Sequence, residues 1–464
     1  MKTKQLLLTV VLVLTTTSMA IAQLQAPVQY WRPYDRSGLN VFETTKDSGA
    51  AFNGLGVRIG GGFTQGYQML SHENYITGTD GKLKATRPDG SALTRVDSAN
   101  QLYKIGSGFN NASANLFIDA QLARGVRLNL ALYLSSRHHQ ETWVKGGYIQ
   151  FDELGFLGSP FLDDIMKYLT IRLGHMEINY GDQHYRRSDG GNSLYNPFVE
   201  NYIIDAFTTE IGADVTFQSN GFLGVIGATN GEIKGNIVPL VDTLDKAPAF
   251  YFKAGYDGKV NEDFRYRLTG SMYTQAQSPR NTLFNGDRTG SNYYMVMEKQ
   301  YSTYSTVQSS TTSQAWSGRV FPNFTNNVTA FQINGFLQFG GLEFFGTYDM
   351  ASGASSAKER DIDTLGNRKM SQIAAELIYR FGNSRNFYVG GRYNAATVEE
   401  GARGPGAYLQ TKIDRISIAA GWYLLDQVFL KAEYMMQNYK DYLPNDYRNG
   451  GKISGLTIQA VVGF

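Results

Sequence analysis

The side chains that carry catalytic or metal-binding chemistry are few in this sequence, and their spacing suits neither task. The chain has no cysteine, which excludes disulfides, thiolate metal sites and a cysteine nucleophile. None of its five histidines belongs to a His-Glu-x-x-His zinc motif, and no Gly-x-Ser-x-Gly nucleophile elbow occurs. We therefore expect no catalysis, no bound metal and no organic cofactor.

Charged side chains instead recur at every second position of apolar segments. Between Val126 and Ser135 the even-numbered residues are all Val or Leu, whereas the odd-numbered residues include Arg127, Asn129 and Tyr133. A period of two residues is typical of a β-strand whose two faces meet different surroundings. The polar faces carry Gly, Thr, Tyr, Gln and Arg, as the lining of a wet interior would. This pattern predicts strands of a transmembrane β-barrel, apolar outside and polar inside.

Sixteen such segments can be counted, and they predict an all-β fold: a 16-stranded antiparallel transmembrane β-barrel. Only helices and closed barrels satisfy every backbone polar group in lipid. The predicted strands are 54–66, 114–122, 126–135, 143–151, 168–177, 206–217, 222–229, 249–256, 263–274, 328–338, 342–350, 370–380, 387–396, 412–423, 427–438 and 453–464.

The connections between these segments alternate between long and short. The long ones are 67–113, 136–142, 178–205, 230–248, 275–327, 351–369, 397–411 and 439–452. Long extracellular loops and short periplasmic turns are typical of outer-membrane barrels. Segment 152–167 is the exception on the short side. Ser159 followed by Pro160 predicts the start of a short helix there.

The N-terminus predicts export from the cytoplasm. Lys2 and Lys4 precede an apolar run, and Ala20-Ile21-Ala22 has the small-x-small pattern of a cleavage site. We expect residues 1–22 to be a cleaved signal peptide. Without Lys2 and Lys4 the 43 basic residues become 41, which equals the 41 acidic residues. A neutral mature chain argues against nucleic-acid binding, because that function needs a basic face.

The last predicted strand alternates up to a terminal Phe464, and this resembles the C-terminal signal that the barrel-assembly machinery recognises. The whole mature chain resembles a 16-stranded Gram-negative porin. Gly181 to Gly191 and Tyr195 to Tyr202 are similar to putative porins of Bacteroidetes-type bacteria, which are loosely grouped with phosphate-selective porins. The resemblance implies an outer-membrane location, contact with lipid and lipopolysaccharide, a homotrimer, and passive diffusion of small hydrophilic solutes or ions.

The polar faces predict which charges line the interior. The expected bases are Arg58, Arg127, Arg172, Arg265, Arg267, Arg392, Arg415 and Lys431, and the expected acids are Glu210, Asp214, Glu343, Asp349 and Glu376. Arg392, Arg415, Lys431 and Arg58 come from neighbouring predicted strands, and we expect them on a wall apart from the acids. A transverse field would then orient dipolar solutes. The alternative is salt bridges between neighbouring strands, without an effect on permeation.

Two segments outside the strands are candidates for narrowing the interior. In porins of this architecture the third outer loop, here 178–205, folds into the barrel, and Asp182, Arg186, Arg187 and Asp189 would form the constriction. The alternative is a solvated surface loop. Residues 23–53, before the barrel of 54–464, are either a small periplasmic plug or a flexible tail.

Two other functions remain open for the same fold. One is a barrel enzyme with a catalytic group at its outer rim, for which the scattered histidines offer no pairing. The other is a plugged or gated transporter, with an adhesion role for the long loops.

Overall fold

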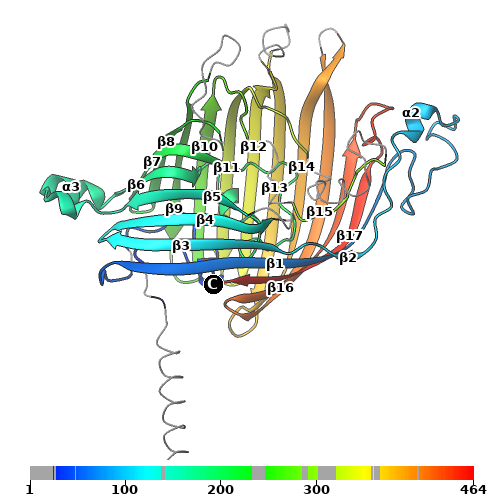
Figure 1. The fold of residues 1–464 in the computed structure, drawn as a ribbon. Coiled ribbons are helices and arrows are strands. Elements are labelled where there is room, and N and C mark those ends of the chain that lie inside the picture. Colours follow the sequence, from blue (N-terminus) through cyan, green and yellow to red (C-terminus); the bar gives the residue numbers. More distant parts are fainter. Residues whose placement is uncertain are drawn as a thin grey trace, which may run out of the picture.

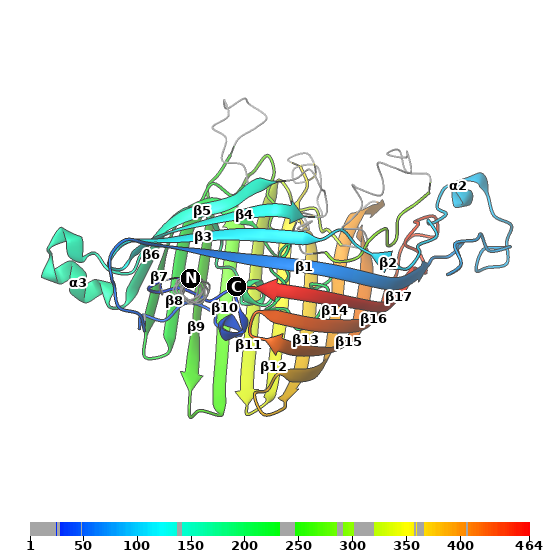
Figure 2. The same ribbon diagram turned by 60° about the horizontal axis from the view of Figure 1, so that its bottom comes forward.

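The chain forms one closed antiparallel β-barrel in the computed structural model (Figures 1 and 2). The structure describes residues 25, 28–47, 49–136, 142–232, 246–284, 291–300, 320–356, 359, 366–404 and 407–464. The expected signal peptide lies outside these ranges.

Sixteen long strands build the wall within the described residues, which confirms the predicted fold class. A two-residue strand, β2 (Gly108–Phe109), adds to the edge of β1. The long strands are β1 (Gly56–Glu73), β3 (Ser113–Ala123), β4 (Val126–Ser136), β5 (Trp143–Phe151), β6 (Leu169–Glu177), β7 (Thr209–Ser219), β8 (Phe222–Thr229), β9 (Ala249–Lys259), β10 (Phe264–Gln275), β11 (Asn327–Phe339), β12 (Leu342–Ala354), β13 (Arg368–Phe381), β14 (Phe387–Gly404), β15 (Ala407–Leu425), β16 (Val428–Lys440) and β17 (Lys452–Gly463).

The first strand closes the barrel because it is long enough to pair on both sides. Residues 56–64 of β1 pair with β3, and residues 62–73 pair with β17. The predicted first strand, 54–66, is therefore too short. The predicted loop 397–411 is also wrong, because β14 and β15 continue their pairing to the two-residue connection 405–406.

Alternation along the strands sorts side chains between the interior and the outside. On β4, Arg127 and Asn129 are buried inside, whereas leucines face outward. Most large apolar side chains that the wall exposes lie on its outer face, including Ile226, Leu268, Ile373 and Ile418. This outward apolar band is what lipid contact requires of a transmembrane barrel.

The two ends of the barrel differ. At the turn end, strands are joined by short connections, such as Asn220-Gly221 between β7 and β8. Both residues have positive φ, as a tight two-residue hairpin requires. At the loop end lie the long connections 74–112, 178–208, 230–248 and 276–326. Loop 74–112 contains α2 (Arg95–Ser98), which lies far from the turn end (Figure 1).

One turn-end connection contains helical structure, as predicted. After η2 (Gly155–Leu157), α3 (Pro160–Met166) begins at Ser159, whose hydroxyl accepts from Leu162 N at 3.5 Å. Two further short 3-10 turns are η1 (Arg36–Gly38) and η3 (Gln183–Tyr185). No helix among the described residues has both the length and the apolar character needed to cross a membrane.

Three segments outside the wall pack inside the barrel. We call them the strap (residues 28–47), the inner segment (178–208) and the lid segment (291–300). In the inner segment every residue except His184, Tyr185 and Asn192 is buried. The interior is therefore largely filled by protein.

Candidate functional site: a passage along one wall

The strap crosses the turn end of the barrel and is fixed to several strands. On the β3 side, the Trp31 indole and the Tyr34 hydroxyl donate to Asp119 at 3.1 and 2.7 Å. On the opposite side, Glu43 accepts from Lys253 at 2.9 Å and from Arg267 at 2.7 Å. These contacts span the mouth from β3 to β10.

The inner segment is bound to the wall made by β12 to β16. Lys431 donates to three carbonyl groups of the segment, those of Ser193, Asn196 and Phe198, at 2.8–2.9 Å. Glu433 accepts from the backbone N–H groups of Val199 and Glu200 at 2.7 and 2.9 Å. This wall is therefore covered by protein.

The opposite side of the interior keeps three cavities that follow one another. The first, about 610 Å³, lies at the turn end between the strap and the β7–β8 and β9–β10 turns. The second, about 140 Å³, shares Phe42, Glu43 and Gln218 with the first. The third, about 210 Å³, shares Arg32, Arg127, Tyr148, Arg172 and Tyr185 with the second. Shared lining residues place the three cavities next to one another, and we call this series of cavities the passage.

Basic and phenolic side chains dominate the junction of the second and third cavities. Arg127 on β4 and Arg172 on β6 flank the ring of Tyr148 on β5, with guanidinium carbons 5.8 and 5.6 Å from the ring centre. Gln150, two residues along β5, is the register partner of both arginines. Sequence alternation on three adjacent strands thus places two cations in one row.

Both arginines have carboxylate partners on neighbouring strands. Arg127 lies 3.3 Å from Asp119, and Arg172 forms a bidentate pair with Asp214. Asp119 and Asp214 are not among the residues that line the second and third cavities, whereas the guanidinium groups are. The passage therefore meets the positive member of each pair.

Arg32 of the strap faces these arginines across the passage. Its guanidinium donates to the carbonyl oxygens of Gly38 and Tyr185 and lies 4.0 Å from the ring centre of Tyr195. Among the described residues, no carboxylate lies within ion-pair distance of Arg32. Arg32 therefore contributes an uncompensated positive charge to both cavities.

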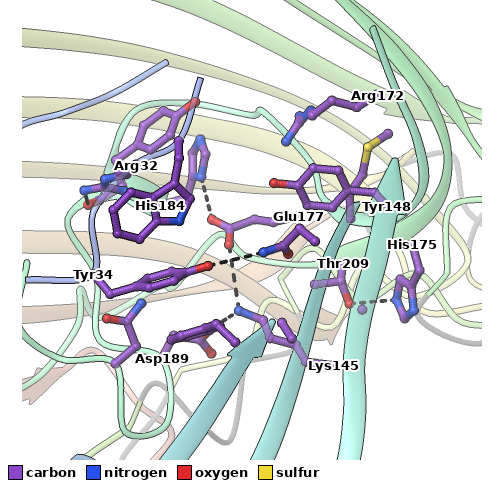
Figure 3. A pocket seen from close by; sticks show the side chains of 18 of the residues that line it. Arg32, Tyr34, Lys145, Tyr148, Arg172, His175, Glu177, His184, Asp189 and Thr209 are labelled. Atoms are coloured by element: carbon purple, nitrogen blue, oxygen red, sulfur yellow. Dashed lines mark hydrogen bonds and ion pairs between the residues drawn. The ribbon is translucent and has the colours of Figure 1, made fainter. Parts of the chain in front are cut away.

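The third cavity also contains a chain of hydrogen bonds and ion pairs (Figure 3). Glu177 lies between His184, 2.5 Å from the ring Nδ1, and Lys145, at 3.8 Å. Lys145 also pairs with Asp189 of the inner segment. On the other side of Figure 3, His175 contacts the Thr209 hydroxyl at 3.0 Å. The chain links β5 and β6 to the inner segment at the loop-end side of the cavity.

Burial sets the protonation of the strap side chains. Burial, followed by the charge of Asp119, raises the pKa of Tyr34 well above its ordinary value, so the phenol stays a neutral donor. Burial lowers the pKa of Lys46, and the nearby Asp152 opposes this shift. The described residues contain no cluster of three or more His, Asp or Glu side chains able to hold a metal ion.

The residues predicted from sequence lie in several parts of the interior. Arg127, Arg172, Arg187 and Asp189 line the third cavity, and Arg265 and Arg267 line the first. Arg58 is half-buried, with its guanidinium 4.2 Å from the Trp31 ring centre. Asp182 pairs with Lys253 and Arg267. Arg186, Arg392, Arg415, Lys431, Glu343 and Glu376 are buried between the β12–β16 wall and the inner segment. Glu210, Asp214 and Asp349 accept hydrogen bonds from Tyr273, Tyr251 and Tyr180.

The expected separation of bases and acids onto different walls is wrong for Arg392 and Glu376. Arg392 and Glu376 are register partners on β14 and β13, with 2.8 Å between charged atoms. Arg380 on β13 forms an ion pair with Glu343 on β12 at 2.6 Å. In both pairs a salt bridge between neighbouring strands neutralises the charges, and this is the alternative that the sequence left open.

Sequence reasoning missed Arg32, Lys145 and Glu177 as cavity residues, and it left Tyr148 open between an interfacial girdle and the lining of the interior. Tyr148 and Lys145 lie on β5, where a register shift between β4 and β5 disturbs the alternation. Arg32 lies in an aromatic and charged stretch, Tyr30 to Asp35, that has no strand pattern. The aromatic and charged composition of this stretch was the signal that could have identified Arg32 as a cavity residue.

No protein-family model matches the chain, and no curated protein matches it. Several solved structures are similar in fold. An anion-selective porin from Comamonas acidovorans has 11% identity and a TM-score of 0.48, and the match covers 88% of this chain and 100% of that one. The outer membrane channel DcaP of Acinetobacter baumannii has 10% identity and a TM-score of 0.48, covering 89% and 99%. OmpT, an outer membrane protein of Vibrio cholerae, has 10% identity and a TM-score of 0.48, covering 89% and 99%.

The closed barrel and its outward apolar band define the class of the protein. Sixteen antiparallel strands with no open edge satisfy the backbone within lipid, and the alternation places apolar side chains outside. The chain is a β-barrel of the outer membrane, with the architecture of a porin.

Proposed function

We propose that the protein is an outer-membrane channel that admits small hydrophilic solutes and favours anions. The observation that carries this proposal is the series of three neighbouring cavities, which begins at the β7–β8 and β9–β10 turns and continues against β4 to β7. Barrels of 16 strands are wide enough to hold an aqueous channel. Here the strap and the inner segment confine that channel to one side.

The preference for anions follows from the side chains at the junction. Arg32, Arg127 and Arg172 line both the second and the third cavity, whereas Glu43 is the one acid lining the second. A narrow, largely protein-walled passage strengthens the effect of each charge, because little water screens it. We assign the inner segment the role of the constriction and the turn end to the periplasm.

Blocking experiments with single cysteines test the route. The chain has no cysteine, so each introduced thiol is unique. Thr216, on β7, lines the second cavity, and Ser417, on β15, is buried on the covered side. In planar bilayers, a negatively charged methanethiosulfonate reagent should reduce the current through Thr216→Cys. It should leave Ser417→Cys unchanged.

The reverse pattern, with block at Ser417→Cys and none at Thr216→Cys, would place the route behind the inner segment and overturn the proposal. Absence of any current from both folded variants and from the parent protein would contradict a channel altogether.

A further inference from the structure

The turn end of the barrel carries a girdle of aromatic side chains on its outer face. Ring-to-ring contacts form two runs, one from β8 to β11 and one from β13 to β15, with centroid separations of 5.0–6.3 Å. The linked pairs are Phe222–Tyr256, Tyr256–Tyr266, Phe264–Phe339, Tyr379–Phe381, Phe381–Phe387 and Phe387–Trp422. Aromatic girdles of this kind mark the boundary between hydrocarbon and headgroups.

The girdle reaches α3 at its β6 end. Tyr168, which follows α3 directly, packs on Phe217 of β7 at 6.3 Å, and both rings are exposed on the outer wall. On β1 and β3 the exposed side chains at the turn end are aliphatic, for example Leu55, Val57 and Leu122. The girdle of the wall therefore stops where α3 begins.

Large apolar side chains of α3 and η2 are exposed, with no cover from the described residues. Phe156, Leu157 and Phe161 are 62%, 56% and 70% exposed. In both views α3 stands away from the barrel beyond the ends of β5 and β6 (Figures 1 and 2). Isolated exposed apolar residues are common, but three together on a protruding element mark an interaction surface.

Apolar and charged side chains lie on different sides of α3. At 100° per residue, Met166 is buried on the barrel side, while Phe161 lies on an apolar outward side. Asp163 and the Asp164–Lys167 pair, 2.6 Å apart, occupy the remaining side. A short element with an apolar side and a charged side fits the plane between lipid and water.

We infer that α3 with η2 is a lipid-binding foot, which inserts Phe156, Leu157 and Phe161 into the headgroup region of the leaflet at the turn end. The occupant is the lipid surface because the apolar side continues the girdle at Tyr168 and Phe217. The foot extends the girdle into the sector where the wall itself provides only aliphatic side chains. This inference does not depend on the channel function.

Depth-dependent quenching of a single fluorophore tests this inference on the full chain. Phe161→Cys and Phe156→Cys are labelled with an environment-sensitive dye, and the protein is reconstituted into phosphatidylcholine–phosphatidylethanolamine vesicles. Asp163→Cys, on the charged side of the same helix, is the matched control. All three positions are exposed, so the substitutions should leave the barrel intact.

The expected result is a blue-shifted emission at positions 161 and 156, with loss of most of the signal to lipids that carry a doxyl quencher near the headgroup. The label at position 163 should emit as in water and resist quenching. Water-like emission at all three positions would overturn the foot. A blue shift that lipid quenchers do not reach, and that disappears when the protein is diluted in lipid, would assign the surface to a second copy and overturn it equally.

Discussion

At the residue scale, function depends on which charged groups the fold leaves facing the passage. Most interior charges are neutralised within the wall or by the inner segment, such as Arg392 with Glu376. Arg32 differs because its guanidinium contacts carbonyl oxygens and an aromatic ring. One cation on the strap thus adds more net charge to the passage than any paired arginine of the wall.

Arg32→Gln should therefore weaken anion selectivity. A unit charge about 4 Å from a passing ion contributes roughly 1 kcal/mol even in water, favourable for an anion and unfavourable for a cation, so we expect the anion-to-cation permeability ratio to fall about thirtyfold. Reversal potentials under a salt gradient measure this ratio. Arg385→Gln is the control, because Arg385 lies in an exposed turn and pairs with Asp263. Equal effects of the two substitutions would deny Arg32 a special role.

At the element scale, alternation specified the wall but not what fills it. The sixteen strands follow from local period-two patterns, and the short helix at Ser159 follows from its cap. The contacts of the inner segment do not follow from any local pattern, because Lys431 and Ser193 are far apart in sequence and meet only when the barrel closes. The irregular backbone of the strap has no period from which its path across the mouth could be predicted.

The attachment of the inner segment to β16 is a second test. Lys431→Met removes the donor to three buried carbonyls, and each unsatisfied group costs roughly 1–3 kcal/mol. We expect a loosened inner segment, seen as larger and noisier single-channel currents. Lys440→Met, on the same strand but exposed, should behave as the parent protein does. Quiet currents of unchanged size from folded Lys431→Met would show that the segment is held by other contacts.

At the scale of the whole molecule, a wide barrel is reduced to a narrow passage. The strap, the inner segment and the lid segment occupy the interior, and the lid segment is tied to β1 where Met297 N donates to the His72 ring at 2.8 Å. What remains open lies against β4 to β7. We therefore predict a conductance well below that of an open pore of sixteen strands.

The most direct test is the reversal potential of the full-length protein in a planar bilayer under a potassium chloride gradient. We predict discrete, small current steps and a reversal potential whose sign shows that chloride is more permeant than potassium. A cation-selective reversal, or silence from protein shown to be folded, would contradict the central claim of an anion-favouring passage along this wall.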